Sequence, residues 1–362
     1  MSDGDLDDDG SDTSADGDGR ADGGDGADGD SDFGGGDSCA DTITDADTIT
    51  DTGTITDADT ITDIDTEPSA TVERRSPDEA FSLLASDLRI DVLRALGEEP
   101  NDSLSFSALF DRVAITDSGN FNYHLGKLLG TFVRKDDGGD YELTLAGKRV
   151  VGAMYAGSYT AAASVDPIPV DWDCTLCGGE MVVEYAEERA TFRCTGCDAG
   201  AKFSFPPGTV DQFDREELPE AFSRWYHRLA TRIADGFCSF CAGRLEGELV
   251  RLPGGTEADP KPSQAAFVCD RCGNEARLSG TGLATTHPVV RGFLAEHGFD
   301  VAARHPSQIW AELDAFDTAI LDEEPPRLEV RFVDEGEAVL AVIEPDATVT
   351  SVERRSVDDR EC

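Results

Sequence analysis

The chain has 362 residues, and 75 Asp and Glu against 30 Lys and Arg give it a formal net charge of −45. This length suffices for two or three domains, and carboxylates in excess along the whole chain are typical of a protein kept soluble in molar salt rather than of a nucleic-acid mimic. No apolar run is long enough for a signal sequence or a membrane span, so we expect a cytoplasmic protein with no membrane partner.

Residues 1–73 consist mainly of Asp, Gly, Ser and Thr, with hardly any large apolar side chain. Such a segment cannot bury enough surface to offset the entropy of ordering its backbone. A six-residue unit recurs four times between Asp41 and Ile64, but four short units are too few for a β-solenoid. We therefore expect a disordered acidic tail, with order beginning near Pro77.

Residues 77–160 predict four helices, a β-hairpin and a further helix, with Ser86 placed to cap the second helix. In the fourth helix (SGNFNYHLGKLLG) the apolar residues recur at helical spacing and the intervening residues are short or polar. Such a helix, with one buried stripe and one hydrogen-bonding face, is what reading the DNA major groove requires. The segment FVRKDDGGDYELT then predicts a wing that turns at residues 137–139.

These residues resemble a known family. LASDLRIDVLRAL is similar to the opening of arsenical-repressor-type (ArsR-like) winged helices, and NFNYHLGKL is similar to their recognition helix. The resemblance covers residues 77–160 and is strongest to winged-helix transcriptional regulators of haloarchaea. It implies a winged helix-turn-helix domain that binds double-stranded DNA as a homodimer, formed through the first and last helices.

The resemblance also implies roles for individual residues. The DNA-binding set would be Ser118, Asn120, Asn122, Tyr123, His124, Lys127, Arg134 and Lys135, the last three on backbone phosphates. The chain departs from the family in a turn one residue shorter after Leu128. Its third helix has no Cys, and its third and fifth helices lack the His, Asp and Glu pairs of metal-sensing members. We therefore expect no metal sensing in this domain.

Eight of the ten cysteines form four Cys-x-x-Cys pairs. They fall into two sets: Cys174, Cys177, Cys194 and Cys197, then Cys238, Cys241, Cys269 and Cys272. Two such pairs at hairpin tips supply the closed thiolate tetrahedron that structural zinc prefers. The spacing predicts two zinc ribbons, at residues 171–208 and 237–283, each with one structural Zn²⁺ and joined by a helix within 209–236. Iron on the same thiolates and redox-active dithiols are the alternatives. Neighbouring hairpins favour ligands paired within each ribbon over ligands paired across the two.

Residues 286–355 predict a small α+β region. Two helical segments, the second running to Phe316, precede the strands RLEVRFV, AVLAVIE and TVTSVER. The expected fold class is therefore α+β multidomain: a disordered acidic N-terminal tail, a winged helix-turn-helix domain, two β-rich zinc ribbons and this C-terminal region.

The sequence contains no phosphate-binding glycine loop, nucleophile elbow or His-Glu-x-x-His helix. Its histidines His227, His287, His297 and His305 are scattered, and we interpret them as surface or capping residues. We expect no catalytic residue and no enzyme. The favoured function is a sequence-specific DNA-binding transcriptional regulator. One alternative is an interaction protein of the basal transcription machinery, because archaeal transcription factor E also joins a winged helix to a zinc ribbon. The other is a thiol redox enzyme or switch.

Overall fold

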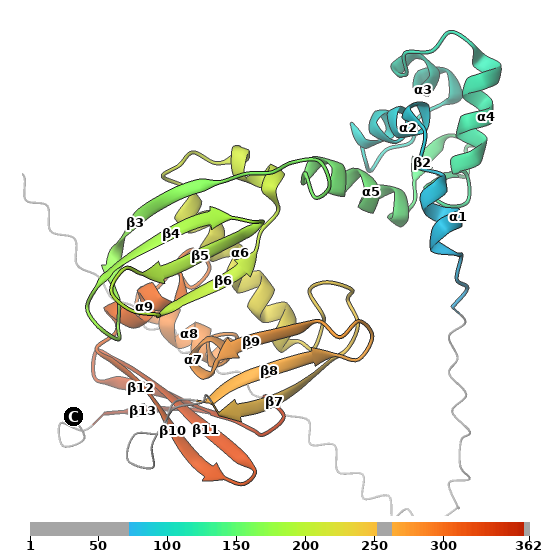
Figure 1. The fold of residues 1–362 in the computed structure, drawn as a ribbon. Helices are drawn as coiled ribbons and strands as arrows, with labels where there is room; N and C mark the ends of the chain where they lie inside the picture. Colours follow the sequence, from blue (N-terminus) through green and yellow to red (C-terminus); the bar gives the residue numbers. More distant parts are fainter. Residues whose placement is uncertain (1–71, 252–262, 358–362) are drawn as a thin grey trace, which may run out of the picture. The chain divides into compact units, whose positions relative to one another are not determined.

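The structure is a computed structural model, and it describes residues 72–251 and 263–357. Nearly all of the expected acidic tail, the long loop of the second cysteine region, Cys39 and Cys362 lie outside the described residues. The described chain is mixed α/β, with helices and four antiparallel sheets (Figure 1). Every helix within these two ranges is too short or too polar to span a bilayer.

The first part of the described chain is mainly helical and has the expected order of elements. It contains α1 (Pro77–Ser82), α2 (Asp87–Gly97), α3 (Phe106–Arg112), α4 (Ser118–Leu128), β1 (Val133–Lys135), β2 (Tyr141–Leu143) and α5 (Leu145–Tyr155). Asp117 begins α4 by accepting hydrogen bonds from the backbone N–H groups of Gly119 and Asn120. Apolar side chains of α2, α3, α4, the hairpin and α5 share one buried core. Only one face of α4 packs against this core.

The first cysteine region forms a four-stranded sheet covered by a long helix. Its strands β3 (Val165–Asp173), β4 (Glu180–Ala186), β5 (Arg189–Cys194) and β6 (Gly200–Ser204) lie in chain order, followed by η1 (Pro207–Gln212) and α6 (Leu218–Ala234). Phe222 of α6 is fully buried, with its ring stacked 6.0 Å from that of Tyr185. The sequence did not predict β3, which contains Pro167 and Pro169. Proline cannot donate to a central strand, and β3 lies at the edge of the sheet, where prolines are tolerated.

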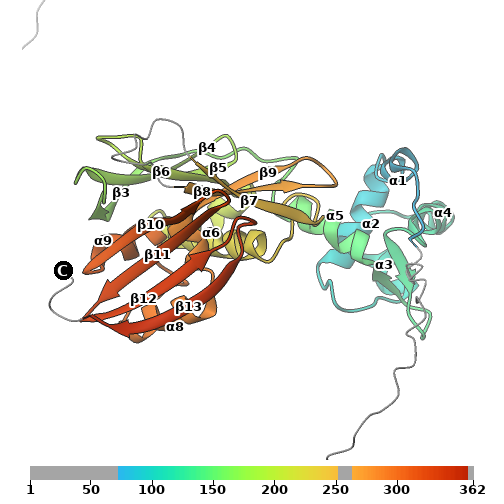
Figure 2. The same cartoon turned by 90° about the horizontal axis from the view of Figure 1, so that it is seen from below.

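The second cysteine region leads into helices and a final sheet. It comprises β7 (Leu245–Arg251), β8 (Ser263–Cys269), β9 (Glu275–Ser279), α7 (Gly280–Ala284), α8 (Pro288–Glu296), α9 (Pro306–Glu312), β10 (Ala315–Glu323), β11 (Pro326–Asp334), β12 (Glu337–Ile343) and β13 (Val349–Ser356). Figure 2 shows the four strands β10 to β13 side by side. The expected helix to Phe316 is wrong at its end, because α9 stops at Glu312. Half-buried Phe316 and Ile320 instead follow the two-residue period of a strand.

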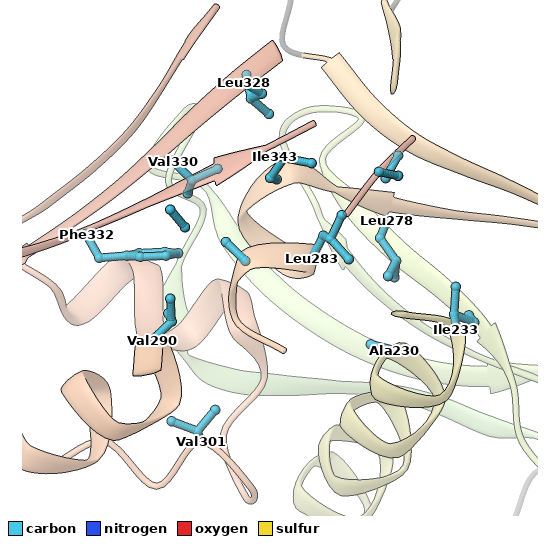
Figure 3. Packing of buried hydrophobic residues seen from close by; sticks show 14 of the residues in the cluster. Ala230, Ile233, Leu278, Leu283, Val290, Val301, Leu328, Val330, Phe332 and Ile343 are labelled. Carbon is cyan, nitrogen blue, oxygen red and sulfur yellow. The ribbon is translucent and has the colours of Figure 1, made fainter. Parts of the chain in front are cut away.

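One buried core joins β7–β9, α6–α8 and the final sheet. Figure 3 shows Leu278 of β9 near Leu283 of α7 and Ile233 of α6, with Val330 and Ile343 of the final sheet on the other side of α7. Cys238 and Cys269 belong to the same core. The second cysteine region and the C-terminal region therefore pack together rather than as separate bodies.

Candidate metal centres and a polar helix face

The structure brings together the two sets of four cysteines that the sequence singled out. Within each set the four Sγ atoms lie within 4.8 Å of one another. The ligands are grouped within each region and not across the two, as the neighbouring hairpins predicted. Each set collects side chains from two hairpin tips, one before β4 or β7 and one after β5 or β8.

The spacing of the sulfurs fits a four-coordinate metal ion. The Sγ–Sγ distances are 3.7 Å for Cys174–Cys197 and 3.5 Å for Cys177–Cys194. In the second set they are 3.8 Å for Cys238–Cys272 and 3.5 Å for Cys241–Cys269. A disulfide has its sulfurs about 2.05 Å apart, whereas a tetrahedron with metal–sulfur bonds of about 2.3 Å has edges of roughly 3.8 Å. Each set could therefore hold one metal ion.

Tight backbone turns place the paired cysteines. In the first turn the Cys174 N–H donates to Gly179 O at 2.9 Å, and the Gly178 N–H donates to Cys174 O at 2.8 Å. The residue after the second cysteine of a pair has positive φ at Gly178 (67°), Gly273 (69°) and Ala242 (55°). Glycine adopts this left-handed conformation without strain, which explains its recurrence after these pairs. Ala242 adopts the same left-handed conformation, which is less favourable for a residue with a Cβ atom.

Backbone N–H groups stabilise part of each set as thiolate, the form that binds metal. The Gly196 N–H donates to Cys194 Sγ at 3.2 Å and is the main reason that the pKa of Cys194 falls to about 7. The Gly179 N–H lowers the pKa of Cys177, but the neighbouring Cys194 and Cys197 raise it to about 12. Four thiolates this close repel one another, so full ionisation requires a cation among them.

The exposed face of α4 carries most of the residues predicted to contact DNA. Phe121, Leu125 and Leu128 are at most 1% exposed. The residues that face solvent are Ser118, Asn120, Asn122, Tyr123 and Lys127. The Lys127 Nζ lies 5.3 Å from the centroid of the Tyr123 ring, so two of these side chains stand together. No other side chain in the described residues covers this polar surface.

The other three predicted DNA-binding residues already have partners. His124 is half-buried, and its Nδ1 lies 3.4 Å from Ser86 Oγ at the start of α2. Ser86 is the N-cap residue of α2, as predicted, but its side chain makes no capping hydrogen bond and its hydroxyl lies toward His124 of α4 instead. Arg134 Nε donates to Glu142 Oε1 at 2.6 Å, and Lys135 Nζ lies 4.9 Å from the Tyr141 ring centroid.

Two histidines that the sequence left scattered are buried together. His305 caps α9, as its side chain accepts the Ser307 N–H, and burial lowers its pKa to about 3. The interpretation of His227 as a surface or capping residue is wrong. It is 6% exposed within α6, bonds through Nε2 to Arg304 O at 2.7 Å, and has a pKa lowered by burial. Its spacing from Ser223 and Ala230 on the buried face of α6 is the sequence signal that would have placed it.

Two family models match the chain, one over the helical core and the other over most of the two remaining cores. Residues 171–349 match a family described as a domain of unknown function, DUF7351, and residues 77–154 match another, DUF7347. The first match encloses both cysteine sets and most of the final sheet, and the second runs from α1 into α5. No curated protein matches the chain.

Proposed function

We propose that this chain is a sequence-specific DNA-binding transcriptional regulator. Residues 77–160 act as an ArsR-like winged helix, α4 is its recognition helix, and the protein binds duplex DNA as a homodimer. The two cysteine sets hold structural zinc in two ribbons, and the chain performs no chemistry. Its effect on transcription follows from occupancy of a promoter site.

The observation that carries this proposal is the divided surface of α4. Its apolar residues are buried in the helical core, while Asn120 and Asn122 are exposed on either side of this buried stripe. Asparagine amides can donate to and accept from a base edge, typically that of adenine, in the major groove. His124 joins α4 to Ser86 of α2, so we assign it to positioning the helix rather than to reading bases.

The charge of the chain shapes how such a protein would bind. With a net charge of −45, the protein repels phosphate as a whole, and the gain from releasing counterions is small. Arg134 is already paired with Glu142, which leaves Lys127 as the main cation on the α4 face. Hydrogen bonds to bases and shape complementarity must then supply most of the affinity.

Mutation of Asn122 tests the proposal. Genome-wide occupancy in the native host would first define the bound sequence. Asn122→Ala should then weaken binding to that sequence by about 1–3 kcal/mol, the cost of one lost base contact. Lys127→Ala should instead weaken binding to all sequences alike, because a phosphate contact carries no sequence information.

Asn101→Ala is the matched control, since Asn101 is exposed but lies outside α4 and bonds to Lys148. It should leave DNA affinity unchanged. If Asn122→Ala bound its site as tightly as the parent protein in the same high-salt buffer, base reading by α4 would be rejected.

A second candidate function is suggested by the tips of the cysteine turns. Leu176 and Phe240 occupy the same position of their Cys-x-x-Cys pairs and are 77% and 80% exposed. Large exposed apolar side chains at matching places suit contact with a protein, as expected of an interaction protein of the basal machinery. Occupancy at promoters in general, lost in a Leu176→Ser, Phe240→Ser double variant but kept in Asn122→Ala, would favour this function over the regulator.

A further inference from the structure

Helix α6 presents a row of arginines in a chain that is otherwise acidic. Arg224, Arg228 and Arg232 follow one another every four residues, so they lie on one face of the helix. Figure 3 shows Ala230 and Ile233 of the same helix directed into the core. Together with Arg291 of α8, the three arginines line a cavity of about 550 Å³. Among the described residues, Asp235 is the one carboxylate in its lining.

Three of the four arginines in this lining form no ion pair within the part of the chain that the structure describes. Arg224 is ion-paired with Glu220, but Arg228, Arg232 and Arg291 form no ion pair with any residue in 72–251 or 263–357.

Arginines elsewhere in the described residues are ion-paired in some cases and not in others, such as Arg149, Arg189 and Arg277. Arg112, Arg327 and Arg354 each contact two carboxylates. What distinguishes the cavity is that four arginines and a single carboxylate share one lining in a chain with 75 acidic residues.

The fold places these charges where they oppose its own stability. Like charges four residues apart disfavour a helix, and α6 has two such steps between its arginines. Arg291 closes the first turn of α8, where its backbone N–H donates to His287 O at 3.0 Å. The dipole of a helix is already positive at that end, so the guanidinium is unfavourable there. An anion among the arginines would remove both penalties.

We propose that this cavity binds a small phosphorylated molecule. Its volume lies within the roughly 300–1,000 Å³ typical of ligand pockets. The guanidinium group offers two parallel N–H donors that match phosphate oxygens. Thr231 adds a hydroxyl group to the lining, and Phe237, 55% exposed, adds an apolar surface for the rest of the ligand. Because Arg291 is half-buried, a compact anion reaches it more readily than the convex backbone of a duplex.

This site does not depend on the DNA-binding proposal and is tested separately. Titration calorimetry on the full-length chain, purified with zinc present, should show saturable binding of inorganic pyrophosphate at one site. Arg228→Gln and Arg291→Gln should each weaken that binding at least tenfold. Arg94→Gln removes the same charge from an exposed position on α2, and should change it less than twofold.

Several results would overturn the proposal. One is failure of pyrophosphate to bind, and another is binding to Arg228→Gln as tight as to the parent. Arg228 is exposed, so its replacement should leave the fold intact. Tighter binding of citrate than of pyrophosphate would show a carboxylate site instead. Competition between pyrophosphate and a mixed-sequence DNA duplex, lost in Arg228→Gln, would assign the arginines to nucleic acid.

Discussion

His305 illustrates how one buried residue links the fold to pH. Its ring stacks 4.1 Å from that of Phe192, and its Nδ1 contacts Ser307. Its Nε2 is buried and has no hydrogen-bond partner among the described residues. Burial, aided by the nearby His227, lowers its pKa from 6.5 to about 3. Between about pH 3 and pH 6.5, His305 is therefore mostly protonated in the unfolded chain and mostly neutral in the folded protein.

This pKa difference predicts acid sensitivity. Because the unfolded state binds more protons between pH 6.5 and 3, the free energy of unfolding should decrease as the pH falls below 6.5, by up to about 1.4 kcal/mol per pH unit from His305. His305→Asn keeps a good helix-capping side chain but cannot titrate. Chemical denaturation at pH 7.5, 6.5 and 5.5, with zinc in excess, should give a shallower pH dependence for this variant.

The loss of ring packing in His305→Asn lowers stability equally at every pH, so only the slope is diagnostic. Some slope should persist, because burial also lowers the pKa of His227. Equal slopes for the parent and the variant would contradict a neutral buried His305.

At the scale of elements, the contact between β7 and the β12–β13 turn couples the second cysteine region to the final sheet. The Leu249 N–H donates to Pro345 O at 2.9 Å. Gly247, two residues earlier, lies so close to this turn that an added Cβ would be 2.7 Å from Asp346 O and 3.0 Å from Ala347 Cβ. Only a residue without a side chain allows this approach.

Gly247→Ala should therefore destabilise the protein by about 1–3 kcal/mol, the usual cost of overpacking. Gly292→Ala is the matched control, because Gly292 lies within α8 with nothing near its Cβ position. It should stabilise the protein by about 0.5–1 kcal/mol through helix propensity. Denaturant midpoints of the two variants measure the difference, and equal midpoints would show that β7 and the turn are not in close contact.

At the scale of the whole molecule, the buried cores set how far the loss of one metal ion spreads. The core of residues 77–155 shares no residue with the other two cores. Those two meet on α6, where Tyr226 and Leu229 pack against both. The second cysteine set also contributes Cys238 and Cys269 to the core of the final sheet.

Metal content and its loss test this arrangement. Elemental analysis under reducing conditions should find two zinc ions per chain, and Cys272→Ser should leave about one. In small peptides, structural zinc couples a binding free energy on the order of 10 kcal/mol to folding. In Cys272→Ser, amide hydrogen exchange should therefore rise in β7–β9, and the rise should extend into β11 and β12. Residues 87–155 should keep their protection.

Cys39→Ser is the matched control, because Cys39 belongs to neither set, and it should retain two zinc ions. A parent protein with almost no zinc, or with iron in its place, would contradict the assignment. If amide hydrogen exchange in Cys272→Ser rose as much in residues 87–155 as in β7–β9, the helical core would not be independent of the second cysteine set.

Several features of this protein were determined by local sequence alone. A Cys-x-x-Cys pair followed by a tight turn brings its two sulfurs together through neighbouring backbone atoms, so the two ligand sets could be predicted from spacing. The stripe of Phe121, Leu125 and Leu128 likewise predicted which face of α4 is buried, because helical geometry alone places these residues together.

Only the tertiary structure decided the features that depend on distant segments. The arginines of α6 and Arg291 of α8 line one cavity because both helices pack on the shared core, and no periodicity in the sequence relates them. His227 and His305 became buried for the same reason. The strand β3 escaped prediction since its prolines are compatible with a strand only at a sheet edge, and an edge is defined by the neighbouring strands.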